Sequence, residues 1–315
     1  MPPRLSVIIP THRRVEALEA CLASLSGQTI PARQFEVLIV DDGSPEEEHA
    51  HLHQLRRERF RVMAIDVRWQ EQAGPARARN DAIRRASAPL ILILNDDVTL
   101  APDHLAVHLR AHAEAPGDEV VFRGLTRWAE DTPDTPIMRW LRETSFRYDW
   151  ELFHPVEAHF VHFHTCDLSA KRALLARFPF DETFPEPCCE DTDLALRLLK
   201  AGTLDLRLLP EARSRHHHVH DLAAIRRRAR MQGRSMARLL ERHPELEYRL
   251  RSGYLELASM GRRRLRVLRR KIFGPWPLYL TALHDFLMLR EIERIVPRPA
   301  RVPPYPQALL DALPG

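Results

Sequence analysis

The segment Leu90–Leu100 constrains the fold of this chain most, and its sequence is Leu-Ile-Leu-Ile-Leu-Asn-Asp-Asp-Val-Thr-Leu. Its five consecutive apolar residues, Leu90–Leu94, predict a short strand that is buried on both faces. The run ends in Asn95, Asp96 and Asp97, and carboxylates at the end of a buried strand are costly unless their charge is compensated. A divalent cation with oxygen ligands would do so. The alternative is an ordinary turn, because Asn and Asp often end strands.

Strands and helices alternate three times before residue 100, which predicts a mostly parallel α/β sheet with crossover helices on its faces. The predicted strands are residues 5–10, 35–40, 61–67 and 90–94. The predicted helices between them are residues 15–25, 46–59 and 74–86. A Rossmann-like sheet of this type binds its ligands at the carboxyl ends of its strands.

The second strand of this set ends in another carboxylate pair, Asp41 and Asp42, followed by Gly43 and Ser44. Gly43 suits a turn with positive φ, so an ordinary turn at the end of a strand is the alternative interpretation for this pair too. Two acidic strand ends that converge on one edge of a sheet nevertheless favour a site for a nucleotide and a cation.

The chain beyond residue 100 is less regular. We expect helices over residues 101–115 and 190–201, and a turn over residues 166–172 that leads into a helix ending at residue 178. We expect strands over residues 120–122, 159–164 and 204–209. Pro210 is expected to end the last of these strands. Residues 128–157 are rich in aromatic residues and Pro, with a short helix expected around 137–143, and an insertion that faces an acceptor would fit there.

Charge divides the 315 residues unevenly, although the net charge is only +4. Residues 213–271 contain 18 Arg or Lys against 5 Asp or Glu. We therefore divide the chain into an α/β domain, residues 1–220, and a basic helical C-terminal extension, residues 221–315. Breaks at His243-Pro244 and Gly274-Pro275 predict three helices in the extension, the last over residues 278–295.

The arginine-rich extension has three interpretations. It is either a solvated helical face, a peripheral membrane surface formed by Arg262–Lys271 and the apolar residues that follow, or a nucleic-acid surface. Nucleic acid ranks last, because aromatic residues are sparse among the arginines and no recognition motif is present. The chain shows neither a transmembrane-length apolar run nor a signal-peptide pattern, and its four cysteines have no metal-type spacing, so we expect a cytoplasmic protein that can touch membranes.

Five motifs in order carry a resemblance to a known family. They are Ser6-Val-Ile-Ile-Pro-Thr, Val37-Leu-Ile-Val-Asp-Asp-Gly-Ser44, Ala78-Arg-Asn80, Asn95-Asp-Asp97 and Glu190-Asp-Thr-Asp-Leu-Ala-Leu-Arg197. Together they resemble the family 2 glycosyltransferases, inverting enzymes of the GT-A fold, over roughly residues 5–235. The resemblance implies a nucleotide-sugar donor, in our interpretation UDP-linked, and a divalent cation, Mn²⁺ or Mg²⁺. It also implies attack by an acceptor hydroxyl of a glycan, a lipid-linked sugar or another glycoconjugate.

The same resemblance assigns roles at the two acidic strand ends. Asp97 would bind the cation, Asp96 would reach the ribose or the sugar, and Asn95 replaces the first acid of the family's Asp-x-Asp motif. Asp42 would accept a hydrogen bond from a uracil-type base, with Asp41 held by backbone groups.

Five further residues of the motifs and the loop after the first strand are expected around the donor. Pro10, Thr11 and Arg13 would line its pocket, and Arg79 and Asn80 would approach its base or phosphates. The alternative for Arg79 is a solvated helix face.

Asp191 is our candidate for the general base, which an acceptor hydroxyl needs because an alcohol is a poor nucleophile at neutral pH. The resemblance places that base in the Glu190-Asp191 pair, with Glu190 and Asp193 as alternatives. A helix N-terminus would keep the carboxylate ionised. The plainer interpretation is helix capping by an acidic cluster, and the two roles are compatible.

The cluster His216-His217-His218-Val219-His220 could supply a further metal ligand, with His216 as first choice and His218 as second. A polar linker is the alternative. Two other functions stay open: a nucleotidyltransferase, for which residues 11–15 lack the Gly and Lys of a phosphate loop, and a non-catalytic scaffold that docks on membranes through its basic tail.

Overall fold

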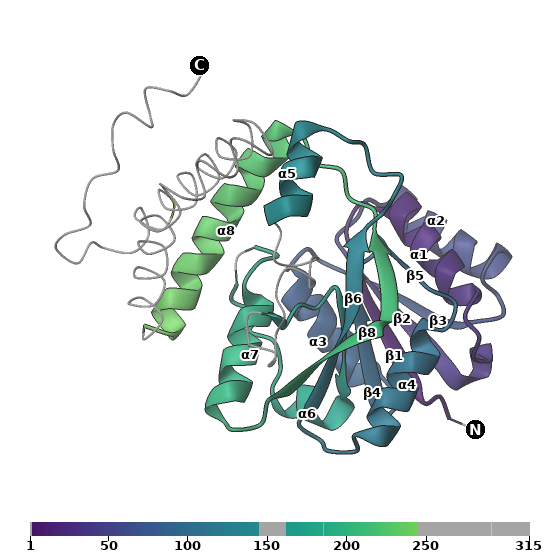
Figure 1. The fold of residues 1–315 in the computed structure, drawn as a ribbon. Helices are drawn as coiled ribbons and strands as arrows, with labels where there is room; N and C mark the ends of the chain where they lie inside the picture. The colour runs from purple at the N-terminus through teal and green to yellow at the C-terminus, as the bar shows by residue number, and fades with distance from the viewer. Residues whose placement is uncertain (1, 145–161, 185, 245–290, 292–315) are drawn as a thin grey trace, which may run out of the picture.

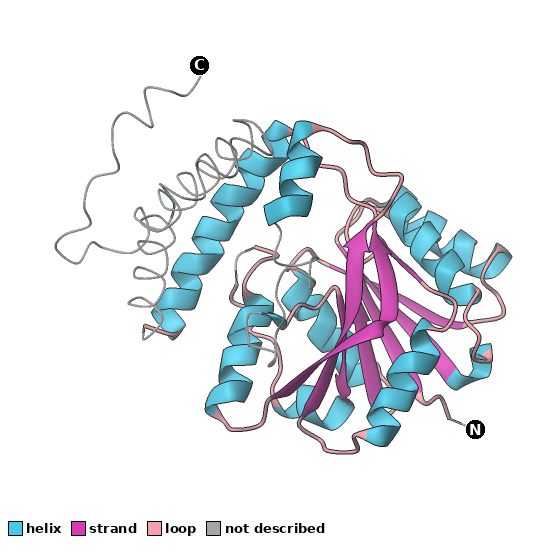
Figure 2. Cartoon of the chain, viewed as in Figure 1, coloured by secondary structure: helices cyan, strands magenta, loops and turns pink. Residues whose placement is uncertain are grey.

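The structure, a computed structural model, describes residues 2–144, 162–184, 186–244 and 291. Its described part forms one sheet with helices on both sides (Figures 1 and 2). The strands are β1 (Leu5–Thr11), β2 (Phe35–Asp42), β3 (Ala64–Gln70), β4 (Leu90–Leu94), β5 (Val98–Leu100), β6 (Val120–Trp128), β7 (Asp167–Lys171) and β8 (Asp205–His216). The helices are α1 (Val15–Ser26), η1 (Ala32–Gln34), α2 (Glu46–Glu58), α3 (Pro75–Arg85), α4 (His104–Glu114), α5 (Pro136–Thr144), α6 (Arg172–Arg177), α7 (Glu190–Lys200) and α8 (Leu222–Arg242).

The order of the strands across the sheet is β3-β2-β1-β4-β7-β6-β8-β5. The first four strands are parallel, as the alternating pattern predicts. β6 also pairs in parallel with β8, whereas β7 is antiparallel to both β4 and β6, and β5 is antiparallel to β8. The sheet is therefore mixed, with a parallel half that presents the ends of β1, β2 and β4 side by side.

The prediction of a strand buried on both faces is confirmed for β4. Leu90, Leu92 and Leu94 pack into the core that α1, α2 and α4 cover, and Ile91 and Ile93 pack into the core that α3, α6 and α7 cover. Burial of this kind stabilises each large side chain by roughly 1.5–3 kcal/mol, so β4 fixes the two layers of the fold.

The strand predicted over residues 159–164 is wrong in its described part, because residues 162–164 form no strand, and residues 159–161 lie outside the described residues. The strand is β7, at residues where a turn into a helix was predicted. Its sequence Asp-Leu-Ser-Ala-Lys lacks a strong β pattern. Pairing on both sides, with β4 and with β6, overrides that weak local preference.

Strand β8 does not end at Pro210 but continues to His216, so the basic tail begins later than Arg213. The register between β6 and β8 shifts between Gly124 and Leu125 and leaves residues 210–212 outside the ladder. A proline is tolerated at such a bulge because its missing N–H is not needed there. β3 begins at Ala64, three residues later than predicted, and the short strand β5 was not predicted.

Helix α8 is the first predicted helix of the extension, and it ends at Arg242, just before the predicted break. Asp221 caps its N-terminus by accepting a hydrogen bond from Ala224 N at 2.6 Å. Ile225 packs on Met138 and Trp140 of α5, which lies beside the first turns of α8 in Figure 1. Apart from residue 291, which is helical, the other two predicted helices and residues 262–271 lie outside the described residues. The boundary at residue 220 stays a prediction. Within the described residues, no helix has the length and apolar content that crossing a membrane requires.

Candidate active site

The carboxyl ends of β2, β1 and β4 lie next to one another and bring two of the sequence motifs together. Thr11, the last residue of β1, pairs in register with Asp41 of β2. On the other side its Oγ1 donates a hydrogen bond to Asp96 Oδ2 at 2.8 Å. Both acidic strand ends therefore belong to one edge of the sheet, as the sequence predicts.

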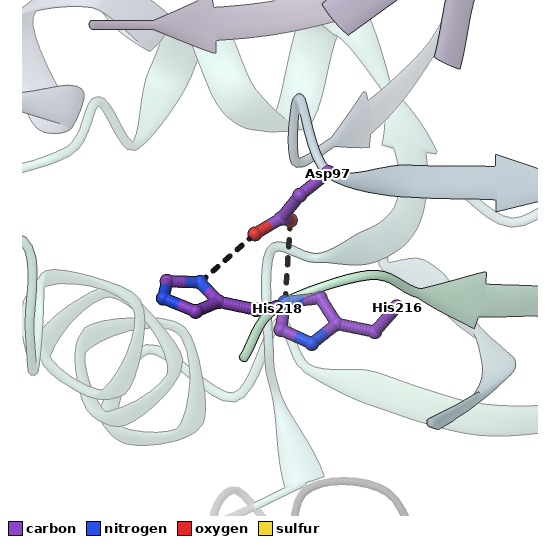
Figure 3. Close-up of side chains that lie close together, drawn as sticks. All are labelled: Asp97, His216 and His218. Atoms are coloured by element: carbon purple, nitrogen blue, oxygen red, sulfur yellow. Dashed lines mark hydrogen bonds and ion pairs between the residues drawn. The ribbon is translucent and has the colours of Figure 1, made fainter. Parts of the chain in front are cut away.

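Asp97 meets two histidines of the cluster at the end of β8, His216 and His218 (Figure 3). Its Oδ1 lies 3.2 Å from His216 Nε2, and its Oδ2 lies 3.1 Å from His218 Nδ1. The backbone creates this contact, because Val98 of β5 pairs with His216 and the N–H of His217 donates to Asp97 O at 2.8 Å. Alternate residues of β8 and its continuation thus point at the same carboxylate.

The pKa values of Asp96 and Asp97 are shifted in opposite directions. Burial opposes ionisation of Asp97, but His216, His218 and Arg14 outweigh it and hold the pKa of Asp97 well below its usual value. Burial raises the pKa of Asp96 to about 7, and the neighbouring charge of Asp97 adds to this effect. Burial also lowers the pKa of His216, which favours the neutral imidazole that a metal requires.

These three residues fit a divalent cation. One ligand atom from each of Asp97, His216 and His218 lies within 4.8 Å of the others. Asp97 Oδ1 is buried and has no hydrogen bond of acceptable geometry in the described part of the chain. A buried carboxylate whose two oxygens each face an imidazole fits a metal site.

Arg14 is a site residue that sequence reasoning missed. Its guanidinium donates to Asp96 Oδ1 at 3.0 Å and to Asp97 Oδ2 at 2.5 Å. Arg13, the predicted residue, has φ of 53° and donates its backbone N–H to Ser44 Oγ at 2.8 Å. The positive φ at Arg13 turns the chain between the two arginines, and the sequence carries no signal for this choice.

The carboxylates at the end of β2 are both held by the surrounding chain. Asp41 accepts from the backbone N–H of Ser44 at 2.9 Å, as predicted, and its other oxygen lies 2.9 Å from His49 Nδ1. Asp42 accepts from Gln70 Nε2 at 2.7 Å and from two backbone N–H groups at 2.8 Å each, those of residues 73 and 74. Asp42 therefore anchors the start of α3, and its role in reading a base stays a prediction.

The remaining donor candidates near this edge are placed by the strands themselves. Pro10 is half-buried and pairs with Val40 across β1 and β2. Asn95 is half-buried, and its backbone N–H lies 3.4 Å from Cys166 O. Gly43 has φ of 83°, and a Cβ there would lie 2.8 Å from Gln72 Cβ, so the turn after Asp42 needs glycine.

The second group of candidates surrounds the N-terminus of α7. Arg79 Nη1 donates to Glu190 Oε1 at 2.6 Å, and both side chains are 5% exposed. The guanidinium also lies over the ring of Phe180, 5.4 Å from its centroid. The alternative of a solvated helix face is excluded for Arg79, because it forms a buried ion pair that joins α3 to α7.

The side chain of Asn80 is hydrogen-bonded to the segment that precedes α7. Its amide donates to Phe180 O and Glu182 Oε1, each at 2.9 Å, and its Oδ1 accepts from Phe180 N at 2.9 Å. Asn80 thus fixes the loop that precedes α7. Its contribution to donor binding stays a prediction.

Asp191 stands at the first turn of α7 and is 7% exposed. Its Oδ1 accepts from the backbone N–H of Thr192 at 2.8 Å, and its Oδ2 lies 3.5 Å from His164 Nδ1. Cys189, the residue before the helix, has φ of 68°, a strained conformation for a residue with a Cβ. Such strain is retained where the surrounding structure dictates it, and here it turns the chain into the helix that carries Glu190 and Asp191.

Asp193, an alternative base, serves a different purpose. It is buried and accepts from Arg197 Nε at 2.7 Å and Arg242 Nε at 2.8 Å, and His243 Nε2 lies 2.9 Å away. These contacts tie α7 to the end of α8. The carboxylate of Asp193 therefore joins the two helices.

The segment expected to face an acceptor holds four aromatic residues that are candidates either for stacking on an acceptor sugar or for the core: Trp128, Trp140, Tyr148 and Trp150. Trp128 lies edge-on to His216, with the ring centroids 4.9 Å apart, whereas Trp140 belongs to the core of α5 and α8. Tyr148 and Trp150 lie outside the described residues.

Comparisons with known sequences give matches over part of the chain. The sequence model described as glycosyl transferase family 2 matches residues 6–184. Validoxylamine A glucosyltransferase from Streptomyces hygroscopicus subsp. jinggangensis is 36% identical over 122 residues, which are 38% of this chain and 28% of that protein. An N-acetylglucosaminyltransferase from Sinorhizobium fredii is 36% identical over 106 residues, 32% of this chain and 24% of its own length. The chain thus matches about a quarter of the length of these relatives.

Solved structures share the fold. The mannosyltransferase PcManGT from Pyrobaculum calidifontis, in complex with GDP-Man and Mn²⁺, superposes with a TM-score of 0.63 at 17% identity, covering 93% of this chain and 87% of that one. S. aureus TarS 1–349, in complex with UDP-GlcNAc, gives a TM-score of 0.54 at 15% identity, covering 92% and 91%. These likenesses confirm the predicted GT-A fold.

Proposed function

Because the chain belongs to glycosyl transferase family 2, we propose that it transfers a sugar, with inversion, from a nucleotide-sugar donor to an acceptor hydroxyl. The observation that carries this proposal is the convergence of Asp97, His216 and His218 on one point beside the ends of β1, β2 and β4. A cation bound there would offset the negative charge that develops on a departing nucleoside diphosphate.

The donor atoms favour Mn²⁺ over Mg²⁺ at this site. Asp97 supplies a carboxylate oxygen, but His216 and His218 supply imidazole nitrogens. Mg²⁺ prefers oxygen ligands and retains its waters, whereas imidazole suits transition metals. The likeness to PcManGT, which is described with Mn²⁺, supports the same choice.

The nucleotide is proposed to lie along the edge between the two acidic strand ends. Asp42 would accept from the base, and Asp96 would reach the ribose or the sugar. The neutral form of Asp96 that burial favours could donate a hydrogen bond as well as accept one. A UDP-sugar is our first choice and a GDP-sugar is the competitor, since structural neighbours are described with each.

Asp191 is proposed as the general base that takes the proton of the acceptor hydroxyl. The N–H of Thr192 and the N-terminus of α7 favour its ionised form. Glu190 is paired with Arg79, and burial, followed by the charge of Asp191, raises the pKa of Glu190 despite that pair. Glu190 is thus the positioning partner, and Asp191 is the proposed acceptor of the proton. The acceptor is proposed to be a glycan, a lipid-linked sugar or another glycoconjugate.

The proposed function is tested by release of nucleoside diphosphate from UDP-Glc, UDP-GlcNAc and GDP-Man, with acceptor mixtures and with or without Mn²⁺. We expect metal-dependent release from one donor and loss of release in Asp97→Ala. If no donor is consumed and no nucleotide binds, the catalytic proposal fails and the scaffold interpretation replaces it. Formation of a nucleotide–sugar bond instead would identify a nucleotidyltransferase.

A further inference from the structure

A second cluster of metal-ligating side chains lies away from the strand ends, between α4 and β7. His104 and His108 are one helical turn apart on α4, so they present the same face to the sheet. Asp167, the first residue of β7, faces them. All three residues are 0% exposed, and their ligand atoms lie within 4.8 Å of one another.

The hydrogen bonds around this cluster leave lone pairs facing each other. The Nδ1 of His104 lies 3.0 Å from Arg213 O, which can only accept, so this nitrogen carries the proton. In the neutral ring the Nε2 of His104 then has a lone pair, and it lies 3.0 Å from Asp167 Oδ1. Two acceptors at this distance need a positive charge between them, which is either a second proton on the ring of His104 or a metal ion.

His108 repeats the arrangement at the same oxygen. Its Nδ1 lies 2.8 Å from Ser169 Oγ, and its Nε2 lies 3.3 Å from Asp167 Oδ1. That Nε2 has no hydrogen-bond partner among the described residues. His108 can place its own proton on Nε2, toward Asp167, when Ser169 donates to its Nδ1, whereas a metal cation would satisfy both contacts with the two rings acting as acceptors.

We propose that His104, His108 and Asp167 bind a buried Zn²⁺ ion, at a site separate from the one formed by Asp97. Tetrahedral zinc with bonds of about 2.0–2.1 Å places neighbouring ligand atoms about 3.3 Å apart, close to the observed 3.0 and 3.3 Å. A tetrahedral ion would need a fourth ligand, which these three side chains do not supply. Two imidazoles and one carboxylate are donors that zinc prefers.

The hydrogen-bond partners of the three proposed ligands would hold them in the orientation that a zinc site needs. Arg213 O and Ser169 Oγ orient the two imidazoles through their Nδ1 atoms, as outer partners of metal-bound histidines do. Ser214 Oγ donates to Asp167 Oδ2 at 2.9 Å, which leaves Oδ1 directed at the histidines. Gly124 makes room for Asp167, because a Cβ at that position would overlap its carboxylate.

The complete burial of the ligands predicts how the ion behaves. It would enter as the chain folds and leave when the chain unfolds, because the folded site has no exposed ligand. The bound ion would therefore resist chelators in the native protein. The site by Asp97 differs, since His218 is partly exposed there.

The test uses the full chain with His216→Ala and His218→Ala, which removes the imidazoles of the other site. The protein is expressed with Zn²⁺ and treated with EDTA in the folded state, and its zinc is measured by mass spectrometry. We expect about one zinc per chain that is released only after denaturation. Co²⁺ incorporated during refolding should give the visible absorption typical of tetrahedral Co²⁺.

His108→Gln in this background should lower the retained zinc at least tenfold. His112→Gln is the matched control, because His112 lies one turn further on the same helix face, is also buried and contacts Ser169 but is outside the ligand set. Retention of zinc in His108→Gln would overturn the proposal. So would a folded His216→Ala/His218→Ala protein without zinc, which decides the matter even if His108→Gln does not fold.

Discussion

Arg14 donates to Asp97 through Nη2 at 2.5 Å, so a side chain already neutralises the carboxylate that is expected to hold a cation. The same guanidinium reaches Asp96 through Nη1 at 3.0 Å. Arg14 therefore stabilises the acidic edge when no metal is bound, and it competes with a metal for Asp97. After a cation binds Asp97, the guanidinium of Arg14 would be free to contact the phosphates of the donor.

Arg14→Gln should tighten Mn²⁺ binding, because it removes this competitor. We expect the dissociation constant to fall about threefold to tenfold, equivalent to roughly 0.7–1.4 kcal/mol, measured by calorimetric titration without nucleotide. Arg13→Gln is the control, since the Arg13 side chain contacts neither carboxylate within the described part of the chain. Weaker Mn²⁺ binding in Arg14→Gln would show that Arg14 supports the site instead of competing.

Asp191→Asn should lower the rate of sugar transfer by about 10²–10⁴-fold, the usual contribution of a general base. Nucleotide binding should not change, because the substitution keeps the volume of the side chain. The measurement compares the turnover number with the dissociation constant of the nucleoside diphosphate. A rate within a few-fold of the native rate would move the role of base to Glu190, whose pKa burial raises.

Asp193→Asn should destabilise the fold by about 2–3 kcal/mol, because it weakens a buried carboxylate that joins α7 to α8. Burial opposes its ionisation, but hydrogen bonds from Arg197, Arg242 and His243 outweigh it and lower the pKa of Asp193.

A lowered carboxyl pKa stabilises the fold above the unfolded value of about 3.9, and this stability is lost as the pH falls through the folded value. The difference in unfolding free energy between the native protein and Asp193→Asn should therefore be full at pH 7 and shrink below about pH 4. A difference that is independent of pH would contradict the assignment.

Gly124→Ala should cost about 1–3 kcal/mol of unfolding free energy, because the added methyl group would overlap the carboxylate of Asp167. Gly27→Ala is the control, since a Cβ there lies 3.8 Å from its neighbours at an ordinary φ of −90°. Chemical denaturation of both variants measures the difference. Equal stability of the two would mean that Asp167 is less constrained than its contacts indicate.

The parallel half of the fold follows from local patterns. Apolar runs such as Leu90–Leu94 and the acidic residues that end them predict β1, β2 and β4 and the edge at which Asp41 and Asp96 meet. These features are readable because strand burial and strand termination depend on neighbouring residues. The helix that begins at Glu190 is equally local.

The errors occur where distant segments decide the structure. β7 forms because β4 and β6 lie on either side of it, and β5 forms because Val98 meets His216 from 118 positions away in the sequence. The choice of Arg14 over Arg13 depends on one backbone angle. His104 and His108 show the spacing of a helical ligand pair, which was a usable signal, but Asp167 becomes their partner only through the fold.

The measurement that most directly tests the central claim is calorimetric titration of UDP, with GDP and TDP as controls, in the presence and absence of Mn²⁺. We predict UDP binding that requires Mn²⁺ and is lost both in Asp97→Ala and in the double variant His216→Ala/His218→Ala. Tight nucleotide binding that persists without metal in all three proteins would contradict the account, because Asp97 and the two histidines would then not hold the cation that binds the donor.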